Sequence, residues 1–227
     1  MKILLFDIDG TIVDVKKSGQ KALFDAFLEV TGQDCSKINL CMAGKTDAGI
    51  IKIIMEAFKV DNSQKNFIIT NYIKNLENNM KIINSFIMPG VMEIINFIKQ
   101  KDYYVPGLLT GNMYDGARLK LEYFELFKYF PFGAYGDNHC NRNDLAIDAL
   151  KRLKHLYGDE SFSNEDIIII GDTPMDIECG KSINAKTIAV ATGPYSMEEL
   201  AEHKPDLLCD TLENTSEIIT FINKSSI

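Results

Sequence analysis

The sequence offers little for disulfide bonding or membrane insertion. Its five cysteines are an odd number and form no CxxC pair, which favours reduced thiols over a disulfide framework or a zinc site. No stretch approaches the roughly 18 unbroken apolar residues that a membrane-spanning helix needs. The N-terminus shows no signal-peptide core followed by a small-residue cleavage site. We therefore expect a cytoplasmic protein with no membrane partner.

Positive charge is also scarce, since 24 Lys and Arg residues face 32 Asp and Glu residues, for a net charge of -8 at pH 7. The sequence contains no basic stripe of the kind that binds phosphate backbones, which argues against a nucleic-acid partner. A hydrophobic share of 46% and a charged share of 25% are typical of a packed globular chain. Its 227 residues suffice for one large domain, or for one domain with a smaller insert.

Short apolar runs that do not alternate with polar residues recur along the chain, as in strands that are buried on both faces. They cover residues 3–6, 103–109, 167–170, 187–190 and about 206–208. Amphipathic helical faces lie between most of them: Val91, Ile94, Ile95 and Ile98; Leu119, Tyr123, Leu126 and Phe127; and Leu145, Ala149, Leu150 and Leu153. This alternation predicts an α/β class, with a doubly wound parallel sheet.

One stretch, from about residue 15 to residue 85, has helical periodicity and no convincing strand. Pro89 and Gly90 close it and restart the α/β pattern. We predict a core domain of residues 1–15 and 86–227 and a helical insert of residues 16–85. Pro106 is an irregularity in the core, because a central strand would lose a ladder hydrogen bond there. Either that strand begins later or it carries a bulge.

The first polar motif is DIDGT, residues 7–11, directly after the apolar run of residues 3–6. Carboxylates two residues apart point to one side of a strand end, and Asp7 and Asp9 would repel each other unless a cation lay between them. Open α/β sheets bind their ligands at this end of the strands. An Asx-type turn, which Gly10 also suits, is the alternative.

The second motif, Thr110, Gly111 and Asn112, follows an apolar run and precedes a helix. A hydroxyl, a glycine that lets backbone N–H groups approach, and a helix N-terminus can together cradle a phosphate. Strand-to-helix turns contain the same residue types for structural reasons alone. The motif therefore indicates an anion site only in combination with others.

The third element is Arg142, which stands ahead of an amphipathic helix. A cation at this point could neutralise both a phosphate and Asp7. The alternative is a solvated arginine at a helix start. Lys151, Arg152 and Lys154 are rival cations, but they lie further along the helix, where we expect them to face water.

The fourth motif, GDTPMD of residues 171–176, follows the aliphatic run of residues 167–170. Magnesium prefers hard oxygen ligands and keeps several waters, which suits Asp172 as a ligand and Asp176 as a group that orients those waters. Asp172 could instead cap a helix with Pro174 in its first turn. Capping accounts for one acid but not for the second acid four residues later, so the motif favours a magnesium site.

In this order, the motifs at Asp7, Thr110, Arg142 and Asp172 resemble those of the haloacid dehalogenase-like hydrolase superfamily. The match covers nearly the whole chain outside residues 16–85, and that insert resembles the helical cap of phosphoglycolate phosphatase-like and β-phosphoglucomutase-like members. The resemblance implies a Rossmann-like core with an inserted α-helical cap domain. It further implies a magnesium-dependent phosphohydrolase that cleaves a small phosphorylated metabolite through an aspartyl-phosphate.

The resemblance also implies roles for the matched residues. Asp7 would be the nucleophile, and Asp9 would protonate the leaving oxygen and later activate water. Arg142 stands where the family usually has a lysine. This departure keeps the positive charge, but a guanidinium presents its N–H donors in a planar fork rather than on one ammonium group. The phosphoryl oxygens would be held by Thr110, Gly111 and Asn112. The Mg²⁺ ligands would be Asp7, the main-chain carbonyl of Asp9, and Asp172, with Asp176 close behind.

A segment of the insert, AGKTDAG at residues 43–49, resembles the substrate-facing loop of related caps. We expect Lys45 to contact the phosphate or the leaving group of the substrate. The alternative is a solvated helix start, with Thr46 or Asp47 as the N-cap of a helix that begins near Ile50.

Three other functions compete with the phosphatase. A phosphomutase of the β-phosphoglucomutase type uses the same core and passes the phosphoryl group to a different acceptor. A dehalogenase needs neither a metal nor an acid for its leaving group, so Asp9, Asp172 and Asp176 argue against it. A non-catalytic binding protein would not need the complete motif set. For the oligomeric state we expect a monomer or a weak homodimer.

Overall fold

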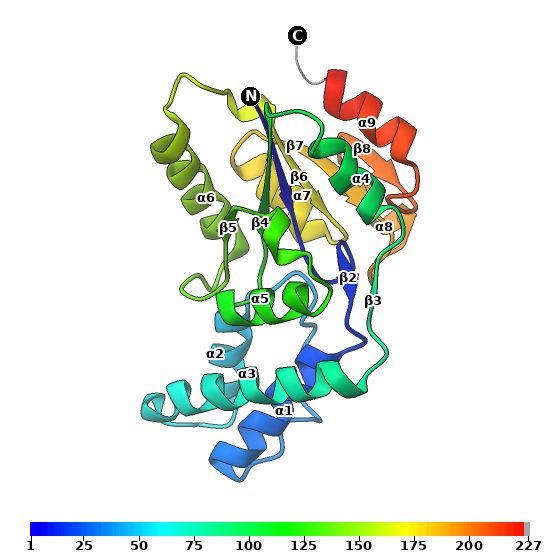
Figure 1. Ribbon diagram of the computed structural model, residues 1–227. Helices are drawn as coiled ribbons and strands as arrows, with labels where there is room; N and C mark the ends of the chain where they lie inside the picture. The colour runs from blue at the N-terminus through cyan, green and yellow to red at the C-terminus, as the bar shows by residue number, and fades with distance from the viewer. Residues whose placement is uncertain (225–227) are drawn as a thin grey trace.

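A computed structural model describes residues 1–224, and within them a six-stranded sheet forms the centre of the molecule (Figure 1). Its strand order is β5-β4-β1-β6-β7-β8, and neighbouring strands run parallel. The predicted α/β class with a doubly wound parallel sheet is confirmed. The strands are β1 (Lys2–Phe6), β4 (Tyr104–Leu109), β5 (Phe132–Ala134), β6 (Ile167–Gly171), β7 (Lys186–Val190) and β8 (Leu207–Cys209).

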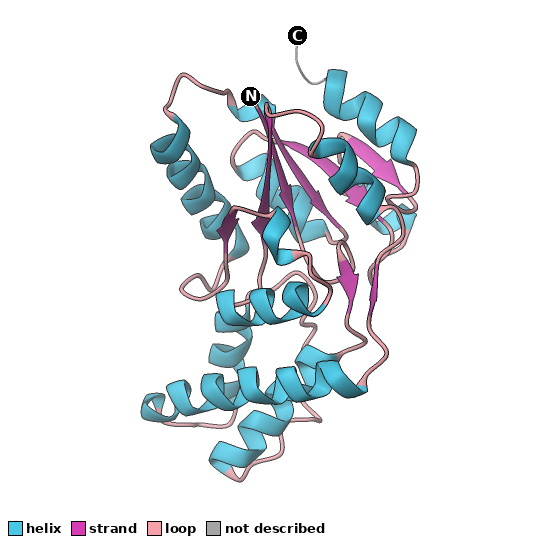
Figure 2. Cartoon of the chain, viewed as in Figure 1, coloured by secondary structure: helices cyan, strands magenta, loops and turns pink. Residues whose placement is uncertain are grey.

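Both faces of the sheet are covered by helices (Figure 2). The helices of this part are α4 (Val91–Ile98), α5 (Tyr114–Tyr123), α6 (Arg142–Tyr157), α7 (Pro174–Ser182), α8 (Met197–Glu202) and α9 (Thr215–Lys224), with 3₁₀ turns at Phe127–Tyr129 and Asn164–Asp166. Along β1, Leu4 and Phe6 join the core on the side of α4 and α9, whereas Ile3 and Leu5 join the core on the side of α6 and α7. This two-sided burial explains why the strand runs are apolar without alternation.

A group of helices lies beyond the carboxyl ends of the parallel strands (Figure 1). These are α1 (Ser18–Thr31), α2 (Asp47–Ala57) and α3 (Lys65–Ile82), with a 3₁₀ turn at Asn62–Gln64. Helices α1 and α3 pack along each other. The chain enters and leaves this group through a short antiparallel pair, β2 (Val13–Asp14) and β3 (Phe86–Ile87). All of these helices fall within the predicted insert of residues 16–85, whose exact limits stay a prediction.

A helix that spans a membrane must be both long and apolar. Of the helices described within residues 1–224, none has both the length and the apolar character to cross a membrane.

Pro106 lies inside β4, and both explanations offered for it from the sequence are wrong. The strand begins at Tyr104, and its register with β1 runs without an offset through Pro106. On the other side of β4, the pairing with β5 begins only at Gly107. Pro106 therefore occupies a stretch of β4 that has a strand neighbour on one side, which is where a strand tolerates proline.

The predicted apolar face of α5 is also wrong. The helix ends at Tyr123, which is half exposed, so Leu126 and Phe127 lie outside it. The buried residues of α5 are Gly116, Ala117, Lys120 and Leu121. The helix thus turns a lysine toward the interior, which a count of apolar residues could not reveal.

Candidate active site

The polar motifs meet at the carboxyl ends of neighbouring strands. Asp7 follows β1, Thr110 follows β4 and Asp172 follows β6, and β4, β1 and β6 are adjacent in the sheet. Parallel strands end at the same edge, so residues far apart in sequence come together there. The helices α1 to α3 lie beyond that edge (Figure 1).

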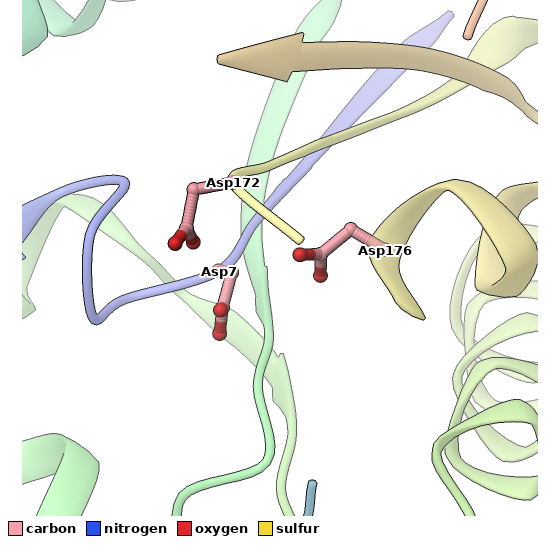
Figure 3. Close-up of side chains that lie close together, drawn as sticks. All are labelled: Asp7, Asp172 and Asp176. Carbon is pink, nitrogen blue, oxygen red and sulfur yellow. The ribbon is translucent and has the colours of Figure 1, made fainter. Parts of the chain in front are cut away.

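Asp7, Asp172 and Asp176 form an acidic cluster at this edge (Figure 3). Each offers a carboxylate oxygen, and these oxygens lie within 4.8 Å of one another. All of these side chains are buried. Asp172 Oδ1 accepts a hydrogen bond from the Thr11 hydroxyl at 3.0 Å. Asp176 Oδ2 accepts hydrogen bonds from the N–H and the hydroxyl of Thr173, at 3.0 and 2.7 Å.

The capping interpretation of this motif is wrong for Asp172. Thr173 is the N-cap of α7, and Asp176 completes a capping box with it. Asp176 therefore helps to start the helix, whereas Asp172 stands outside the helix and faces Asp7. Capping thus accounts for Asp176 and leaves Asp172 free for another role.

Arg142 is the cation of the acidic cluster. It is the first residue of α6, and its Nη2 lies 3.1 Å from Asp7 Oδ1 and 2.5 Å from Asp176 Oδ1. The rival cations point elsewhere: Lys151 is exposed, Arg152 donates to the carbonyl of Gly133 at 3.0 Å, and Lys154 lies 3.9 Å from Asp159. Among these cations, the structure brings Arg142 to Asp7.

The acidic cluster has more negative than positive charge. Burial raises the pKa of Asp176 to about 6, and repulsion from Asp7 adds to this shift while Arg142 opposes it. Burial, followed by repulsion from Asp7 and Asp176, raises the pKa of Asp172 well above its usual range. A divalent cation would offset this excess, and a set of carboxylate oxygens is the donor type that magnesium prefers.

Glycines let the backbone close tightly around Asp172. A Cβ at Gly193 would lie 1.7 Å from Asp172 Oδ2, and a Cβ at Gly10 would lie 2.4 Å from the same oxygen. Gly10 also has a φ of +80°, a conformation that disfavours other residues. These glycines leave the carboxylate room that any larger residue would remove, so the residues present fit a small metal ion.

A pocket of about 450 Å³ opens between the acidic cluster and the helical insert. Of the described residues in the second motif, Gly111 and Asn112 line it and Thr110 does not. The buried Thr110 hydroxyl accepts hydrogen bonds from the backbone and side chain of Asn112, at 3.3 and 2.9 Å. The walls of the pocket include Asp7, Asp9 and Arg142 from the core and Lys45, Asp47 and Tyr72 from the insert.

Lys120 is a functional candidate that the sequence patterns missed. Its Nζ donates to Asp9 Oδ2 and to Asn112 Oδ1, each at 2.6 Å, and its side chain is only 3% exposed. Asn112 Nδ2 also donates to Asp9 Oδ2, at 2.8 Å. The sequence carried no signal for this contact, because the helical spacing of Lys120 from Gly116 and Ala117 does not distinguish a buried lysine from a solvated one.

Residues 43–49 of the insert contact the second motif of the core. The N–H of Asp47 donates to the carbonyl of Gly111 at 2.7 Å. Asp47 Oδ2 accepts from the N–H of Met113 at 2.9 Å and from the hydroxyl of Tyr72 at 3.3 Å. Burial raises the pKa of Asp47 to about 6, and repulsion from Asp9 adds to the shift, while Lys120 and these hydrogen bonds oppose it. Asp47 therefore joins the insert to the core beside the pocket.

The start of α2 differs from the prediction. The helix begins at Asp47 rather than near Ile50, and Thr46 is its N-cap, accepting from the N–H of Gly49 at 3.1 Å. The capping alternative is therefore correct for Thr46 and wrong for Asp47. Lys45, just before the cap, lines the pocket, and its contact with a substrate stays a prediction.

Two buried polar atoms of the site stand out. Within residues 1–224, the buried side-chain nitrogen and oxygen atoms that lack a hydrogen-bond partner are Asp9 Oδ1 and Arg142 Nε. Leaving such atoms unpaired is costly, and unpaired groups concentrate at sites that bind a ligand or an ion. Both residues also line the pocket. Within the described chain, the buried side-chain atoms that lack a hydrogen-bond partner therefore belong to residues of this pocket.

Known proteins are similar to this chain in sequence and in fold. A family model described as haloacid dehalogenase-like hydrolase matches residues 4–190. The chain is 24% identical to a phosphoglycolate phosphatase of Aquifex aeolicus over 223 residues, which is 98% of this chain and 97% of that protein. It is 26% identical to the pyrophosphatase PpaX of Listeria monocytogenes over 227 residues, with 96% of this chain and 95% of that protein covered.

Its fold is similar to a crystal structure described as a predicted phosphoglycolate phosphatase from Haemophilus somnus. The TM-score is 0.74 at 18% identity, over 96% of this chain and 98% of that chain. Together these matches confirm the resemblance predicted from the motifs. The names of the two relatives, a phosphatase and a pyrophosphatase, confirm the prediction of a phosphatase-type enzyme.

Proposed function

Because the chain belongs to the haloacid dehalogenase-like hydrolase family, we propose that it hydrolyses a small phosphorylated metabolite through an aspartyl-phosphate on Asp7. The observation that carries this proposal is the contact between Asp7 and Arg142 at the floor of a pocket, beside the buried Asp172 and Asp176. A carboxylate nucleophile, a cation for the phosphoryl oxygens and an acid cluster for a metal are the parts that phosphoryl transfer requires.

The reaction has two steps. In the first, a carboxylate oxygen of Asp7 forms a bond to phosphorus, the bond from phosphorus to the leaving oxygen breaks, and Asp9 gives that oxygen a proton. In the second, Asp9 takes a proton from water, whose oxygen bonds to phosphorus while the bond to Asp7 breaks. Inorganic phosphate leaves and Asp9 is again protonated. Arg142 offsets negative charge on the phosphoryl oxygens, and its unpaired Nε supplies a further donor.

Magnesium is the cofactor that we propose for the acidic cluster. Asp7, Asp172 and the main-chain carbonyl of Asp9 would hold it, with Asp176 close behind. When bound, it supplies positive charge that stabilises the phosphoryl group during transfer. Asp176 forms an ion pair with Arg142, whereas the hydrogen bond described for Asp172 comes from the neutral hydroxyl of Thr11. Asp172→Ala should therefore weaken the apparent magnesium affinity more than Asp176→Ala does.

The substrate is proposed to be small and strongly anionic. The pocket of about 450 Å³ suits a metabolite rather than a polymer, and Lys45 and Lys120 add cations beyond Arg142. The similar proteins named above are a phosphoglycolate phosphatase and a pyrophosphatase. We propose that the helical insert acts as a cap over this pocket, which excludes water during the first step.

The test is a phosphate-release assay on a panel of sugar phosphates, phosphoglycolate, pyrophosphate and p-nitrophenyl phosphate. We expect activity that disappears with EDTA and returns with magnesium, and inhibition by calcium, whose looser coordination shell disturbs in-line geometry. Equal activity with and without the chelator would contradict the metal assignment. An isomerised sugar phosphate without release of phosphate would favour the phosphomutase instead.

A further inference from the structure

The two carboxylate oxygens of Asp9 differ in their hydrogen bonds. Oδ2 accepts from Lys120 Nζ at 2.6 Å and from Asn112 Nδ2 at 2.8 Å. Oδ1 is buried and has no hydrogen-bond partner among the described residues. Burying an unpaired carboxylate oxygen is unfavourable, so this orientation of Asp9 persists only because the two donors on Oδ2 outweigh that cost.

The side chain of Lys120 is buried and paired, which restricts its position. Lysine is rarely buried unless it is paired, and this side chain is 3% exposed. It rises from α5, which packs against α3 of the insert, and its Nζ also donates to Asn112 Oδ1 at 2.6 Å. A Cβ at Gly19 would lie 3.7 Å from Nζ, so the start of α1 also borders the ammonium group. With core and insert around it, Lys120 has few other positions to adopt.

From this geometry we infer that Lys120 is a positioning residue, which together with Asn112 fixes the carboxylate of Asp9 for proton exchange with the leaving group. The inference rests on the proposed function, because it needs Asp9 as the proton donor. Lys120 does not touch the phosphorus or exchange a proton in either step. It acts by holding Asp9 in the one orientation that faces the leaving oxygen.

Two other roles for Lys120 predict different kinetics. If Lys120 bound the substrate directly, its loss would raise KM and leave kcat nearly unchanged. If it were a structural ion pair, its loss would lower the activity on all substrates by the same factor. A positioning role predicts a loss in the rate of the first step that depends on the leaving group, because only a poor leaving group needs a proton from Asp9. The second step, in which Asp9 takes a proton from water, is the same for every substrate, so the first turnover has to be measured separately.

The experiment compares Lys120→Met with the wild-type enzyme on two substrates. One is the best alkyl phosphate of the panel, whose alkoxide leaving group needs a proton, and the other is p-nitrophenyl phosphate, whose phenolate leaves without one. We expect the rate of leaving-group release in the first turnover of the alkyl phosphate to fall about 100-fold, the scale of a misplaced catalytic group. On p-nitrophenyl phosphate this first-turnover rate should fall by less than about 3-fold, with KM within about 2-fold on both substrates. Lys120→Arg, which keeps the charge, should recover part of the alkyl phosphate activity.

Arg118→Met is the matched control, since Arg118 lies on the same helix and its Nη1 pairs with Glu122 at the surface, at 3.4 Å. It should leave both activities unchanged. An equal loss of first-turnover rate by Lys120→Met on both substrates, or a rise in KM alone, would overturn the positioning role and leave the proposed function intact. A wild-type enzyme inactive on the whole panel would overturn both. If Lys120→Met does not fold, Lys120→Gln takes its place, judged by the same ratio of losses.

Discussion

The two sides of the pocket differ in the number of cations that neutralise their acids. On the side of the sheet, Asp7, Asp172 and Asp176 share the single guanidinium of Arg142, which contacts Asp7 and Asp176. On the side of the insert, Asp9 has its own cation, because Lys120 lies 2.6 Å from it. The first side has three acids for one guanidinium, whereas on the second side Lys120 contacts Asp9 directly and also offsets the nearby Asp47.

This difference suits the two sides to different roles, one to metal binding and the other to the orientation of an acid. A region with excess carboxylate charge attracts a divalent ion, which is the basis of the magnesium proposal. A region whose acid is already paired gains little from a metal, but it can hold that acid in a fixed direction. The same residue types would therefore serve the proposed ion binding on one side and the proposed orientation of Asp9 on the other. The predictions below alter one side at a time, beginning with the largest expected effect.

Asp7→Asn should abolish turnover, because an amide is a far poorer nucleophile of nearly the same shape. We expect a loss of at least about 10³-fold in kcat on every substrate. The melting temperature of the metal-free protein should hold or rise, since the change removes repulsion with Asp172 and Asp176. Steady-state kinetics and thermal unfolding check the two effects. Retention of a tenth of wild-type activity would rule out Asp7 as the nucleophile.

Arg142→Ala should lower kcat by about 10²-fold, or ~3 kcal/mol of transition-state stabilisation. It leaves the acidic cluster without a cation, so the metal-free protein should also melt at a lower temperature. Arg142→Lys should recover much of the activity. The matched control is Lys151→Ala, on the same helix and exposed, which should behave like wild type. The reverse pattern, an active Arg142→Ala and an inactive Lys151→Ala, would assign the third motif to Lys151.

Lys45→Ala tests the insert side of the pocket. It should lower kcat/KM for the best metabolite about 10-fold, because binding energy from Lys45 is gained when the insert contacts the substrate. The effect on p-nitrophenyl phosphate, which makes few contacts with the insert, should be much smaller. Lys52→Ala is the control, because Lys52 lies on α2 of the insert and is exposed. Equal losses on both substrates would indicate damage to the fold, and no loss on either would make Lys45 a surface residue.

Asp47→Asn should have the smallest effect, a change in stability that depends on pH. The pKa of Asp47 is raised in the folded protein to about 6 from a usual 3.8, so the folded state binds this proton more tightly than the unfolded state between those values. The contribution of Asp47 to stability is therefore largest at low pH and is lost as pH rises through about 6. Asparagine stays neutral, and it can accept the same hydrogen bonds from Met113 and Tyr72.

The variant should melt about 2–4 °C above wild type at pH 7, which corresponds to roughly 1 kcal/mol for a chain of this size, and no higher near pH 4. Thermal unfolding of both proteins from pH 4 to pH 8 measures this difference. Because the other acids titrate in both proteins, the difference isolates Asp47. A constant difference across this range would show that Asp47 does not titrate there.

The parts of the structure that depend on local sequence were predictable. The aliphatic runs at β1 and β6 are long enough to mark buried strands, and each is followed directly by its acid, Asp7 or Asp172. Strand ends in a parallel sheet share one edge, so the acidic cluster followed from the fold class. The strand β5 was missed because Phe132–Ala134 is too short to show a period.

The insert side of the pocket could not be predicted in the same way. Lys120 contacts Asp9 across 111 positions of the chain, and no spacing rule relates the two residues. The pairing of Asp47 with Met113 likewise depends on how α2 meets the core. A buried lysine is indistinguishable from a solvated one by residue type, and only the three-dimensional packing of α5 against α3 decides which it is.

The short pair of strands β2 and β3 holds the two ends of the insert together. Val13 lies opposite Ile87 and Asp14 lies opposite Phe86, so the chain leaves the core and returns to it at one point. Antiparallel neighbours can be joined by a turn of as few as two residues or by a longer connection. A variant in which the connection between Asp14 and Phe86 is replaced should therefore keep the order of β1, β4 and β6, and with it the strand ends that Asp7 and Asp172 follow.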